Sequence, residues 1–313
     1  MLSLKDRISG GLVGLLVGDA LGVPYEFHPP SAIPSLELIE FEPPPEFDRS
    51  HPGIKPGTWS DDGAQALCLL ASLLHCDRFD PRDFASRLIG WYNHGYMAVD
   101  RHVFDVGIQT GVAISKLRSG IAPLEAGGAD EYSKGNGSLM RVLPLALWHQ
   151  GSDQALVLDA HDQSRVTHGH VTVQACCALY CLWARRMLEQ TNDPWSDALS
   201  ALRSIYKDSP AFEEALEGEI RPDARRVPQG SGFVLDCLFS AKQAVAAGLY
   251  ETVVKTAVAF GQDTDTTACV AGGIAGIRDG LDAIPRRWRE QLRGRDELMM
   301  LHDRLLERRG RRT

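Results

Sequence analysis

The sequence predicts an all-α fold, arranged as a compact orthogonal bundle of many helices. Apolar residues recur with the period of about 3.6 residues that is typical of helices along most of the chain, and the alternation typical of strands is almost absent. Clusters of β-branched residues are few. The chain has 313 residues, 44% of them hydrophobic and 24% charged, so it is long enough to bury a large core. No fixed repeat and no low-complexity linker divides it into separate parts.

The predicted helices carry start and stop signals. Asp80 precedes Pro81 and Asp193 precedes Pro194, and each pair combines a capping side chain with a proline suited to the first turn. Glycines at positions 120, 151 and 248 follow other apolar segments and indicate helix ends. We expect helices over residues 3–21, 62–76, 81–93, 103–119, 138–150, 152–166, 170–190, 195–207, 232–247, 249–260, 264–279 and 297–309.

The first predicted helix resembles a signal peptide, because a short charged stretch precedes the apolar run ISGGLVGLLVGDALGV. Asp6 lies in the region that should be basic, Asp19 interrupts the apolar region, and no convincing cleavage site follows. The apolar stretch is also judged too short to span a membrane. We therefore expect residues 3–21 to form a glycine-rich helix in the core.

Two segments do not have a helical pattern. Residues 28–57 contain eight prolines, and residues 218–231 contain two prolines among several charged residues. Both are expected to be long surface loops, and long loops in a compact domain are often functional.

Charge and cysteine content limit the class of protein. The net charge of −8 argues against general nucleic-acid affinity. Arginines are dense after residue 285, but acids are interspersed, which favours a solvated terminal helix whose basic end, about 308–313, frays. The seven cysteines include no CxxC pair, and Cys177 and Cys181 have apolar neighbours typical of a core. A reduced, cytoplasmic protein is expected.

Two acidic motifs precede apolar helices. In GTWSDDGAQALCLL, a helix cap explains one oxygen-bearing side chain but not Ser60, Asp61 and Asp62 together. In GQDTDTTACVAGGIAG, two carboxylates and a hydroxyl again stand at a helix start, and neither motif has the spacing of a calcium hand. Such oxygen ligands suit Mg²⁺, Mn²⁺ or Ca²⁺. Two matching motifs favour a shared site, in which two divalent cations are chemically plausible.

Other motifs are weaker by themselves. GDALGVPYEF contains Asp19 and Glu26, and KGNGSLMRVLPLAL contains a glycine turn that could cradle phosphate, although an ordinary loop is the commoner explanation. Asp105 is expected on a mostly apolar helix, where a carboxylate needs a partner or a site. His168 or His170 could contact a ligand, although a histidine in a loop is more often solvated or capping. No G-x-S-x-G elbow or H-E-x-x-H motif is present.

Taken together, GDALGVPYEF, TWSDDG, GNGSLMR, THGH and GQDTDTTA resemble, in order and spacing, the ADP-ribosylglycohydrolase family. The family includes the dinitrogenase-reductase-activating glycohydrolase and ADP-ribosyl-arginine hydrolases. The resemblance covers about residue 5 to about residue 280. It implies an all-α domain with a binuclear Mg²⁺ centre in a central cleft, Mn²⁺ being a possible substitute. Because the two acidic motifs share one site in the family, a single domain over residues 1–313 is expected.

The resemblance also implies roles for individual residues. Glu26 would lie beside the metals and the scissile ribose, and Asp105 would contact the ribose or transfer a proton. His168 would lie near the ribose or phosphate, and a turn would hold the diphosphate. The metal ligands would be Ser60, Asp61, Asp62, Asp263, Asp265 and Thr266, and the turn would comprise Asn136, Gly137, Ser138, Leu139 and Met140.

One residue departs from the family pattern. The family usually has Thr-Asp-Asp-Thr where this chain has Ser60-Asp61-Asp62-Gly63. Serine retains the hydroxyl ligand, whereas Gly63 lacks the last hydroxyl, and a supporting hydrogen bond is expected to loosen.

The implied activity is Mg²⁺-dependent removal of ADP-ribose from modified targets, foremost cleavage of the N-glycosidic bond of ADP-ribosyl-arginine. An O-linkage to serine, a nucleic-acid adduct, a silent ADP-ribose-binding module and an unrelated helical scaffold remain alternatives. Silent relatives tend to lose metal ligands, and the six ligand positions here keep oxygen side chains. The expected partners are an ADP-ribosylated protein or small molecule, with no membrane, and the expected state is a monomer.

Overall fold

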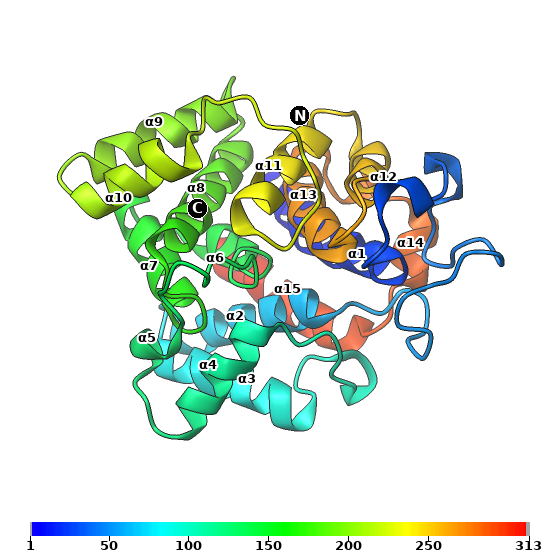
Figure 1. Ribbon diagram of the computed structural model, residues 1–313, viewed down its shortest axis with the longest axis horizontal. Coiled ribbons are helices and arrows are strands. Elements are labelled where there is room, and N and C mark those ends of the chain that lie inside the picture. The colour runs from blue at the N-terminus through cyan, green and yellow to red at the C-terminus, as the bar shows by residue number, and fades with distance from the viewer. Residues whose placement is uncertain (1, 311–313) are drawn as a thin grey trace.

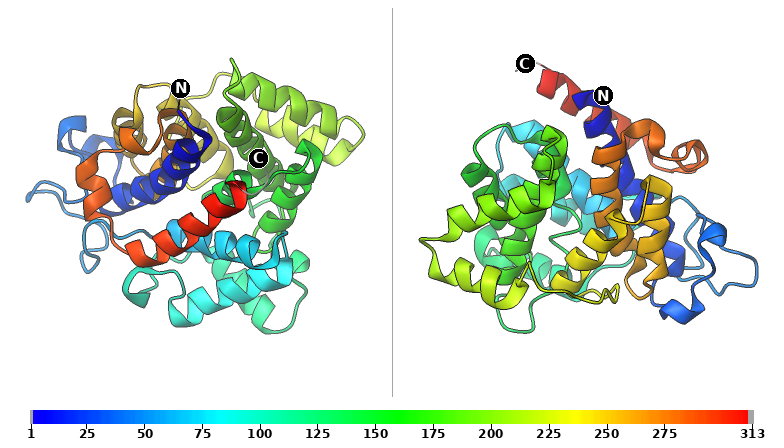
Figure 2. Two further views of the ribbon diagram at one scale, coloured as in Figure 1. Left: turned by 180° about the vertical axis from the view of Figure 1, so that it is seen from behind. Right: turned by 90° about the horizontal axis from the view of Figure 1, so that it is seen from above.

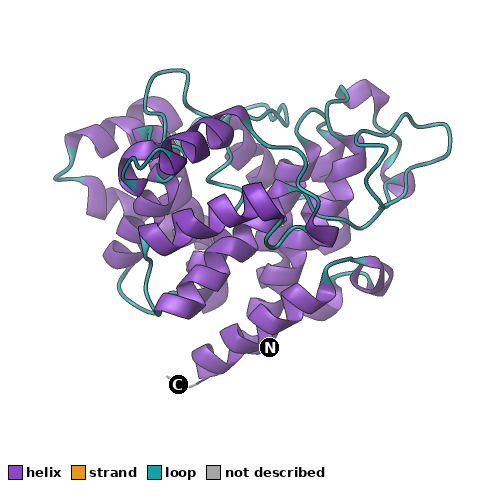
Figure 3. Ribbon diagram, turned by 90° about the horizontal axis from the view of Figure 1, so that it is seen from below, coloured by secondary structure: helices purple, strands orange, loops and turns teal. Residues whose placement is uncertain are grey.

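The computed structural model describes residues 2–310, and within that range it contains 15 α-helices and no β-strand (Figures 1 and 3). The predicted all-α class is therefore confirmed. The helices are α1 (Leu4–Gly22), α2 (Asp61–Cys76), α3 (Pro81–His94), α4 (Ile108–Arg118), α5 (Pro123–Ala126), α6 (Leu143–Trp148), α7 (Asp153–Arg165), α8 (Val171–Glu189), α9 (Pro194–Tyr206), α10 (Pro210–Glu214), α11 (Val234–Val245), α12 (Tyr250–Ala259), α13 (Thr264–Asp279), α14 (Arg286–Gln291) and α15 (Arg295–Gly310).

Most predicted helices begin and end within a few residues of the observed bounds. The sequence does not predict α5, α10 and α14, because each is too short to show a period. It also misses a π-helix at Ala215–Ile220, whose end overlaps the loop expected over residues 218–231. Local pattern therefore identifies the long helices and overlooks the short ones.

Asp105 does not lie on a helix, and that prediction is wrong. Helix α4 begins at Ile108 after Gly107, rather than at residue 103. Asp105 has φ 53°, a left-handed backbone conformation that a right-handed helix excludes. The apolar residues around Asp105 therefore belong to a loop.

The helix predicted over residues 138–150 is also shorter than expected. Helix α6 begins only at Leu143, and Pro144 occupies its first turn, where a missing N–H donor is tolerated. The residues before α6 form a compact turn.

Helices α1 and α13 pack with their backbones in contact (Figure 1). Glycines spaced four residues apart on α1 make this possible. A methyl group built at Gly14 would lie 2.5 Å from the carbonyl oxygen of Gly272, and one at Gly18 would lie 2.1 Å from that of Ala268. Two helices about 240 residues apart in sequence are thereby joined.

The helix that the sequence assigns to the core is indeed buried. The expectation that its apolar stretch is too short to cross a membrane is wrong, because Leu4–Tyr25 has sufficient length and apolar character for that. All of its most apolar window is, however, enclosed by other parts of the protein. Its hydrophobicity is explained by burial in the core.

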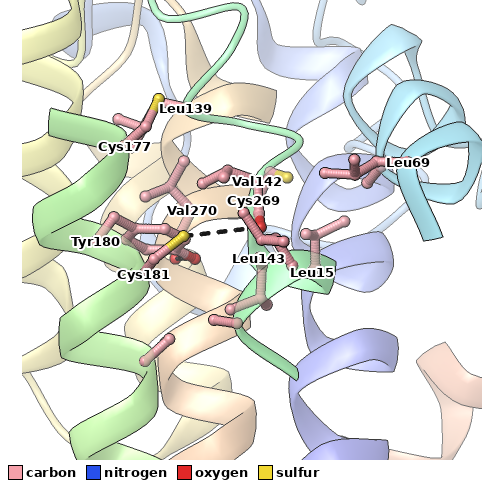
Figure 4. Packing of buried hydrophobic residues seen from close by; sticks show 14 of the residues in the cluster. Leu15, Leu69, Leu139, Val142, Leu143, Cys177, Tyr180, Cys181, Cys269 and Val270 are labelled. Atoms are coloured by element: carbon pink, nitrogen blue, oxygen red, sulfur yellow. Dashed lines mark hydrogen bonds between the residues drawn. The ribbon is translucent and has the colours of Figure 1, made fainter. Parts of the chain in front are cut away.

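The other helices surround this pair. Helices α7 to α10 pack side by side, α2 packs against α3, and α15 crosses the back of α2 and α1 (Figure 2). Figure 4 shows Leu15 of α1, Leu143 of α6 and Tyr180 of α8 converging in the core. The Tyr180 hydroxyl donates to the Val270 carbonyl over 2.9 Å. Cys177 and Cys181 are free and buried there, as expected.

Of the C-terminal residues 308–313 that are expected to fray, only residues 308–310 belong to the described part of the chain. Residues 308–310 continue α15, and Arg308 Nε donates to Asp77 Oδ1 over 2.6 Å. Residues 311–313 lie outside the described residues.

The proline-rich segment 28–57 is a loop with only short 3₁₀ turns, as expected. Glu40 fastens it to the body: Trp288 Nε1 donates to Glu40 Oε2 over 2.5 Å and Arg287 Nη2 donates to Oε1 over 2.8 Å. Ile39 and Phe41 on either side are buried. The loop is thus held firmly where it passes the rest of the fold.

Candidate metal centre and cleft

The starts of α2 and α13 meet, although they are about two hundred residues apart in sequence. The Thr266 hydroxyl donates to Asp62 Oδ1 over 3.3 Å. The two oxygen-bearing motifs therefore lie together, and their aspartates influence one another's pKa values. The oxygen-bearing residues of this cluster are Ser60, Asp61, Asp62, Asp263, Asp265 and Thr266.

Capping accounts for little of this cluster. Ser60 caps α2 by accepting from the N–H of Asp62 over 3.2 Å. Asp263 precedes α13 but makes no side-chain cap. Its carboxylate instead accepts from Asn136 Nδ2 over 2.9 Å. The aspartates are therefore available for a role other than capping.

Asp19 of α1 supports the start of α2 from below. Its carboxylate accepts from the N–H of Ser60 over 2.9 Å and from the N–H of Gly63 over 2.7 Å. Asp19 is fully buried, and this burial raises its pKa to about 7. The glycine contacts between α1 and α13 place this carboxyl group beneath the cluster.

The cluster concentrates negative charge, and the nearest cationic side chain acts from behind it, because Arg141 is linked to Asp61 only through Gln65. Burial, and then the neighbouring carboxylates, raise the pKa values of Asp61, Asp62 and Asp265 well above their usual range. Within residues 2–310, no ion pair joins these three aspartates to a lysine or arginine. Oδ2 of Asp62 and Oδ2 of Asp265 are buried without any hydrogen-bond partner. Orphaned carboxylate oxygens in an acidic site fit divalent cations.

Glu26 lies beside this cluster. Oxygen atoms of Glu26, Asp263 and Asp265 lie within 4.8 Å of one another. Burial, followed by the charges of Asp105 and other aspartates, raises the pKa of Glu26 to about 10. Burial and the charge of Asp263 raise the pKa of Asp105 to about 6. Both predicted catalytic carboxyls are thus brought to the acidic centre.

A cleft of about 390 Å³ opens over the acidic centre. Its walls come from the segment after α1, the starts of α2, α4 and α13, and the glycine turn. Ser60 and Asp265 do not line it and lie deeper. The lining residues are Glu26, Phe27, Asp61, Asp62, Asp105, Gly107, Ile108, Gln109, Thr110, Gly135, Asn136, Gly137, Met140, His168, Gly232, Asp263 and Thr266.

The glycine turn reaches the cleft only in part. Asn136, Gly137 and Met140 line it, whereas Ser138 and Leu139 have their side chains in the core. Asn136 accepts from the N–H groups of Leu139 and Met140 over 2.7 and 3.1 Å, and no bond within the described residues uses the N–H groups of Gly137 and Ser138. These two N–H groups could receive an anion.

His168 closes one side of the turn. A methyl group built at Gly137 would lie 2.8 Å from His168 Cε1, so this close approach requires glycine. Burial, and next the charge of Arg141, lower the pKa of His168 to about 3. The ring is therefore neutral at neutral pH, and its Nδ1 lies 2.7 Å from the Thr167 hydroxyl.

Sequence reasoning missed a buried polar chain behind the site. Asp61 Oδ2 accepts from Gln65 Nε2 over 2.7 Å, and Gln65 Oε1 accepts from Arg141 Nη1 over 2.8 Å. Arg141 Nη2 also donates to Thr167 Oγ1 over 2.7 Å. This series of hydrogen bonds links the acidic centre to the neighbourhood of His168. Arg141 ends the motif GNGSLMR, but an arginine in a motif does not by itself indicate complete burial.

His51 is a second residue that sequence reasoning missed. Its Nε2 atom lies 2.7 Å from Glu26 Oε2. The available signal was indirect: His51 belongs to the proline-rich segment 28–57, which the sequence marks as a candidate functional loop.

Comparison with known proteins places the chain among enzymes that act on ADP-ribose. A sequence profile described as ADP-ribosylglycohydrolase matches residues 1–313. The ADP-ribosylarginine hydrolase Tri1 of Pseudomonas putida (strain GB-1) is 30% identical, over 97% of this chain and 78% of that protein. Human ADP-ribosylhydrolase ARH3 is 27% identical, over 95% of this chain and 92% of that protein.

Two further similarities agree. The ADP-ribosyl-[dinitrogen reductase] glycohydrolase of Rhodospirillum rubrum is 27% identical, over 93% of this chain and 91% of that protein. A solved structure described as an ADP-ribosylglycohydrolase-related protein complex has a TM-score of 0.76 and 32% identity, over 97% of this chain and 98% of that chain. The chain therefore belongs to the ADP-ribosylglycohydrolase family and is a hydrolase that removes ADP-ribose.

Proposed function

We propose that this enzyme is Mg²⁺-dependent and cleaves the N-glycosidic bond of ADP-ribosyl-arginine. The observation that carries the proposal is the joining of two acidic helix starts with orphaned carboxylate oxygens, at which no described lysine or arginine forms an ion pair with Asp61, Asp62 or Asp265. The name of the Tri1 relative supports arginine as the linked residue. An acidic cleft also suits a cationic guanidinium group.

The ligand set proposed for two Mg²⁺ ions, or Mn²⁺ in their place, is Ser60, Asp61, Asp62, Asp263, Asp265 and Thr266. When bound, such cations would orient ribose hydroxyls and polarise water. The N–H groups of Gly137 and Ser138 would receive the diphosphate, with His168 beside them. Leu139 would contribute only by shaping this turn from the core.

Glu26 and Asp105 would act on the reacting bond. Cleavage of an N-glycoside develops positive charge on the ribose, which a neighbouring carboxylate stabilises while another group transfers a proton. Both carboxyls face the cleft, and both have raised pKa values because of burial and neighbouring acids. Their position at the cleft suits either carboxyl group to transfer a proton to the leaving nitrogen.

The test is release of ADP-ribose from ADP-ribosyl-arginine, from ADP-ribosyl-serine and from ADP-ribosylated nucleic acid, each with Mg²⁺ and with chelator. We expect Mg²⁺-dependent release from the arginine compound. Asp61→Ala and Asp263→Ala should abolish it while circular dichroism retains the helical signal. Asp282→Ala is the matched control, because its side chain is 97% exposed and does not line the cleft.

The other outcomes discriminate among alternatives. Full activity in both variants, or in excess chelator, would refute the metal proposal. Release of ADP-ribose only from the serine compound or from nucleic acid would show that the enzyme acts on that linkage instead of the arginine linkage. Tight ADP-ribose binding without any release would indicate a binding module.

We also propose that the chain forms one domain over residues 1–313 and acts as a cytoplasmic monomer on ADP-ribosylated proteins or small molecules. The contact of α1 with α13 supports a single domain, and the free cysteines are compatible with a reducing compartment. Size-exclusion chromatography with light scattering tests the monomer.

A further inference from the structure

The residues around Glu26 have unusual backbone conformations. Phe27 has φ 63°, His51 has φ 52° and Asp105 has φ 53°. Left-handed conformations are uncommon for residues other than glycine and cost free energy, so they persist where the surrounding structure enforces them. Two of these residues, His51 and Asp105, come from separate segments and have ligand atoms within 4.8 Å of the Glu26 carboxyl, which indicates that the fold holds the backbone there in one conformation.

The segment around His51 folds back onto the segment that contains Glu26. The N–H of Ser50 donates to the Pro24 carbonyl over 2.9 Å, and the Ser50 hydroxyl donates to the Glu26 carbonyl. These bonds fix the backbone of residue 51 relative to that of residue 26. The His51 ring then reaches the Glu26 carboxyl, with Nε2 and Oε2 2.7 Å apart.

Two aromatic rings lie beside the imidazole at tilted angles, in addition to the contact at Nε2. Its centroid lies 5.2 Å from that of Phe104 and 5.7 Å from that of Phe27. The side chains of His51 and Glu26 are 17% and 5% exposed, so solvent competes little for their hydrogen bond. An aromatic setting and a short bond together leave the ring one orientation.

The carboxylates around Glu26 explain why a hydrogen-bond donor beside it would matter. Its carboxyl group lies next to Asp263 and Asp265 on one side and to Asp105 on another, with ligand atoms of each group within 4.8 Å. Repulsion among these carboxylates would favour rotation of the Glu26 side chain toward solvent. A neutral hydrogen-bond donor opposes that rotation without adding a charge to the centre.

We propose that His51 is a positioning residue for Glu26: its Nε2–H donates to the Glu26 carboxyl and holds that group facing the cleft. The proposal rests on the catalytic role proposed for Glu26. It also explains why the proline-rich segment 28–57 is fastened to the body at Glu40, because a mobile loop would not hold the ring. His51 itself does not line the cleft, so it acts through Glu26.

The test uses His51→Ala and His51→Gln in the full-length enzyme, with ADP-ribosyl-arginine as the substrate. Glutamine places an amide donor near the position of Nε2, and alanine removes the donor. His28→Ala is the matched control: His28 Nδ1 contacts the Glu26 carbonyl over 2.9 Å and its ring packs at a tilt against Phe47, but no hydrogen bond joins it to the Glu26 carboxyl. Thermal unfolding of each variant monitors the loop, because residue 51 has a left-handed backbone.

We expect His51→Ala to lower kcat on the order of 10- to 100-fold, as loss of a hydrogen bond that orients an active-site group does. KM and the calorimetric Kd for ADP-ribose should change by no more than about threefold, since the bond orients the carboxyl and does not bind the ligand. His51→Gln should recover most of the lost kcat, and His28→Ala should resemble the unmodified enzyme.

Two results would overturn the proposal. One is an unchanged kcat in His51→Ala. The other is an equal loss in His51→Ala, His51→Gln and His28→Ala with a lowered unfolding temperature, which would indicate loop anchoring only. Glu26→Gln separates this from the proposed function. If Glu26→Gln is fully active, the proposed catalytic role of Glu26 is refuted. If Glu26→Gln is inactive while His51→Ala is fully active, only the positioning role of His51 is refuted.

Discussion

Gly63 shows how a single residue adapts this acidic centre. The sequence suggests a lost hydroxyl, but the position has no room for one. A methyl group at Gly63 would lie 2.7 Å from Leu16 Cδ2, 2.8 Å from Trp59 Cγ and 2.9 Å from Asp19 Oδ2. The Gly63 N–H donates to Asp19, and the Trp59 ring is held by a bond from its Nε1 to the Met97 carbonyl over 3.0 Å. Packing around glycine therefore keeps the α2 start in place.

Gly63→Thr should destabilise the protein by about 1 to 3 kcal/mol, because it overpacks a full site. The substitution should also lower metal affinity, since Asp19 would move away from the N–H groups of Ser60 and Gly63, which donate to it. Chemical denaturation and titration with Mn²⁺ measure both effects. A threonine variant with higher stability and tighter metal binding would show that the glycine is a defect rather than an adaptation.

His161 is a buried titratable residue far from the cleft. Its Nε2 lies 2.7 Å from the Tyr206 hydroxyl, and its ring stacks on Phe212 with centroids 4.2 Å apart. Burial, and next the charge of Arg165, lower the pKa of His161 from 6.5 to about 3. The folded state therefore keeps this ring neutral at pH values where the unfolded chain protonates it.

The sign of the pH effect follows from that difference. The unfolded state binds more protons below pH 6.5, so stability is lost as the pH falls from 6.5 toward 3. At pH 5 the loss from His161 should be about 2 kcal/mol. His161→Gln should reduce the fall in stability between pH 7 and pH 5 by roughly this amount, measured by urea unfolding. His94→Gln, at an exposed position, is the control; an equal reduction there would contradict the assignment.

At the scale of elements, the contact between α1 and α13 places the functional groups. The same glycine face that lets the two backbones touch aligns Asp19 of α1 with the start of α13. Gly22 at the end of α1 lies so close that a methyl group there would be 2.3 Å from the Asp265 Cα. The Thr264 hydroxyl donates to the Gly22 carbonyl over 2.8 Å. A small separation of these helices would therefore disturb the acidic centre.

Gly18→Ala should lower stability by about 1 to 3 kcal/mol or more, because its methyl group would lie against the Ala268 carbonyl. Gly90→Ala in α3 is the matched control, since the nearest atom to its methyl group would be 3.8 Å away. That variant should be neutral or more stable by about 0.5 to 1 kcal/mol, as alanine favours a helix. Thermal unfolding compares the two, and equal effects would argue against backbone contact as the cause.

At the scale of the whole molecule, the acidic centre joins segments that are distant in sequence. Carboxylates from α2 and α13 repel one another in the absence of a cation, and this repulsion acts against the fold. A ligand that binds only the folded state raises its stability in proportion to the logarithm of ligand concentration. Metal binding and stability should therefore be coupled across the chain.

Addition of Mg²⁺ to chelator-treated protein should raise the unfolding temperature, with a gain of about 2.7 kcal/mol at one hundred times the Kd. Asp62→Asn and Asp265→Asn should each reduce this gain, because each removes a charge that the cation would neutralise. Differential scanning calorimetry at constant ionic strength separates the stabilisation caused by Mg²⁺ binding from general salt effects. An unchanged gain in both variants would place the cation elsewhere.

The long helices, the core position of the first helix and the two acidic helix starts could be predicted from sequence. Helical period, caps and runs of oxygen ligands act over a few neighbouring residues, and such signals are visible along the chain. The short helices α5, α10 and α14 lack enough residues for a period. The left-handed conformation of Asp105 also carries no local signal, because its neighbours have an apolar pattern that suits a helix.

By itself, the sequence determined an all-α protein in which two motifs of oxygen-bearing side chains stand at the starts of helices. Only the tertiary structure decided that Asp19 supports α2, that Arg141 links Asp61 to His168 through Gln65, and that His51 meets Glu26. These contacts join residues separated by long stretches of chain. Their geometry depends on how closely whole helices and loops pack, which no local pattern of residues encodes.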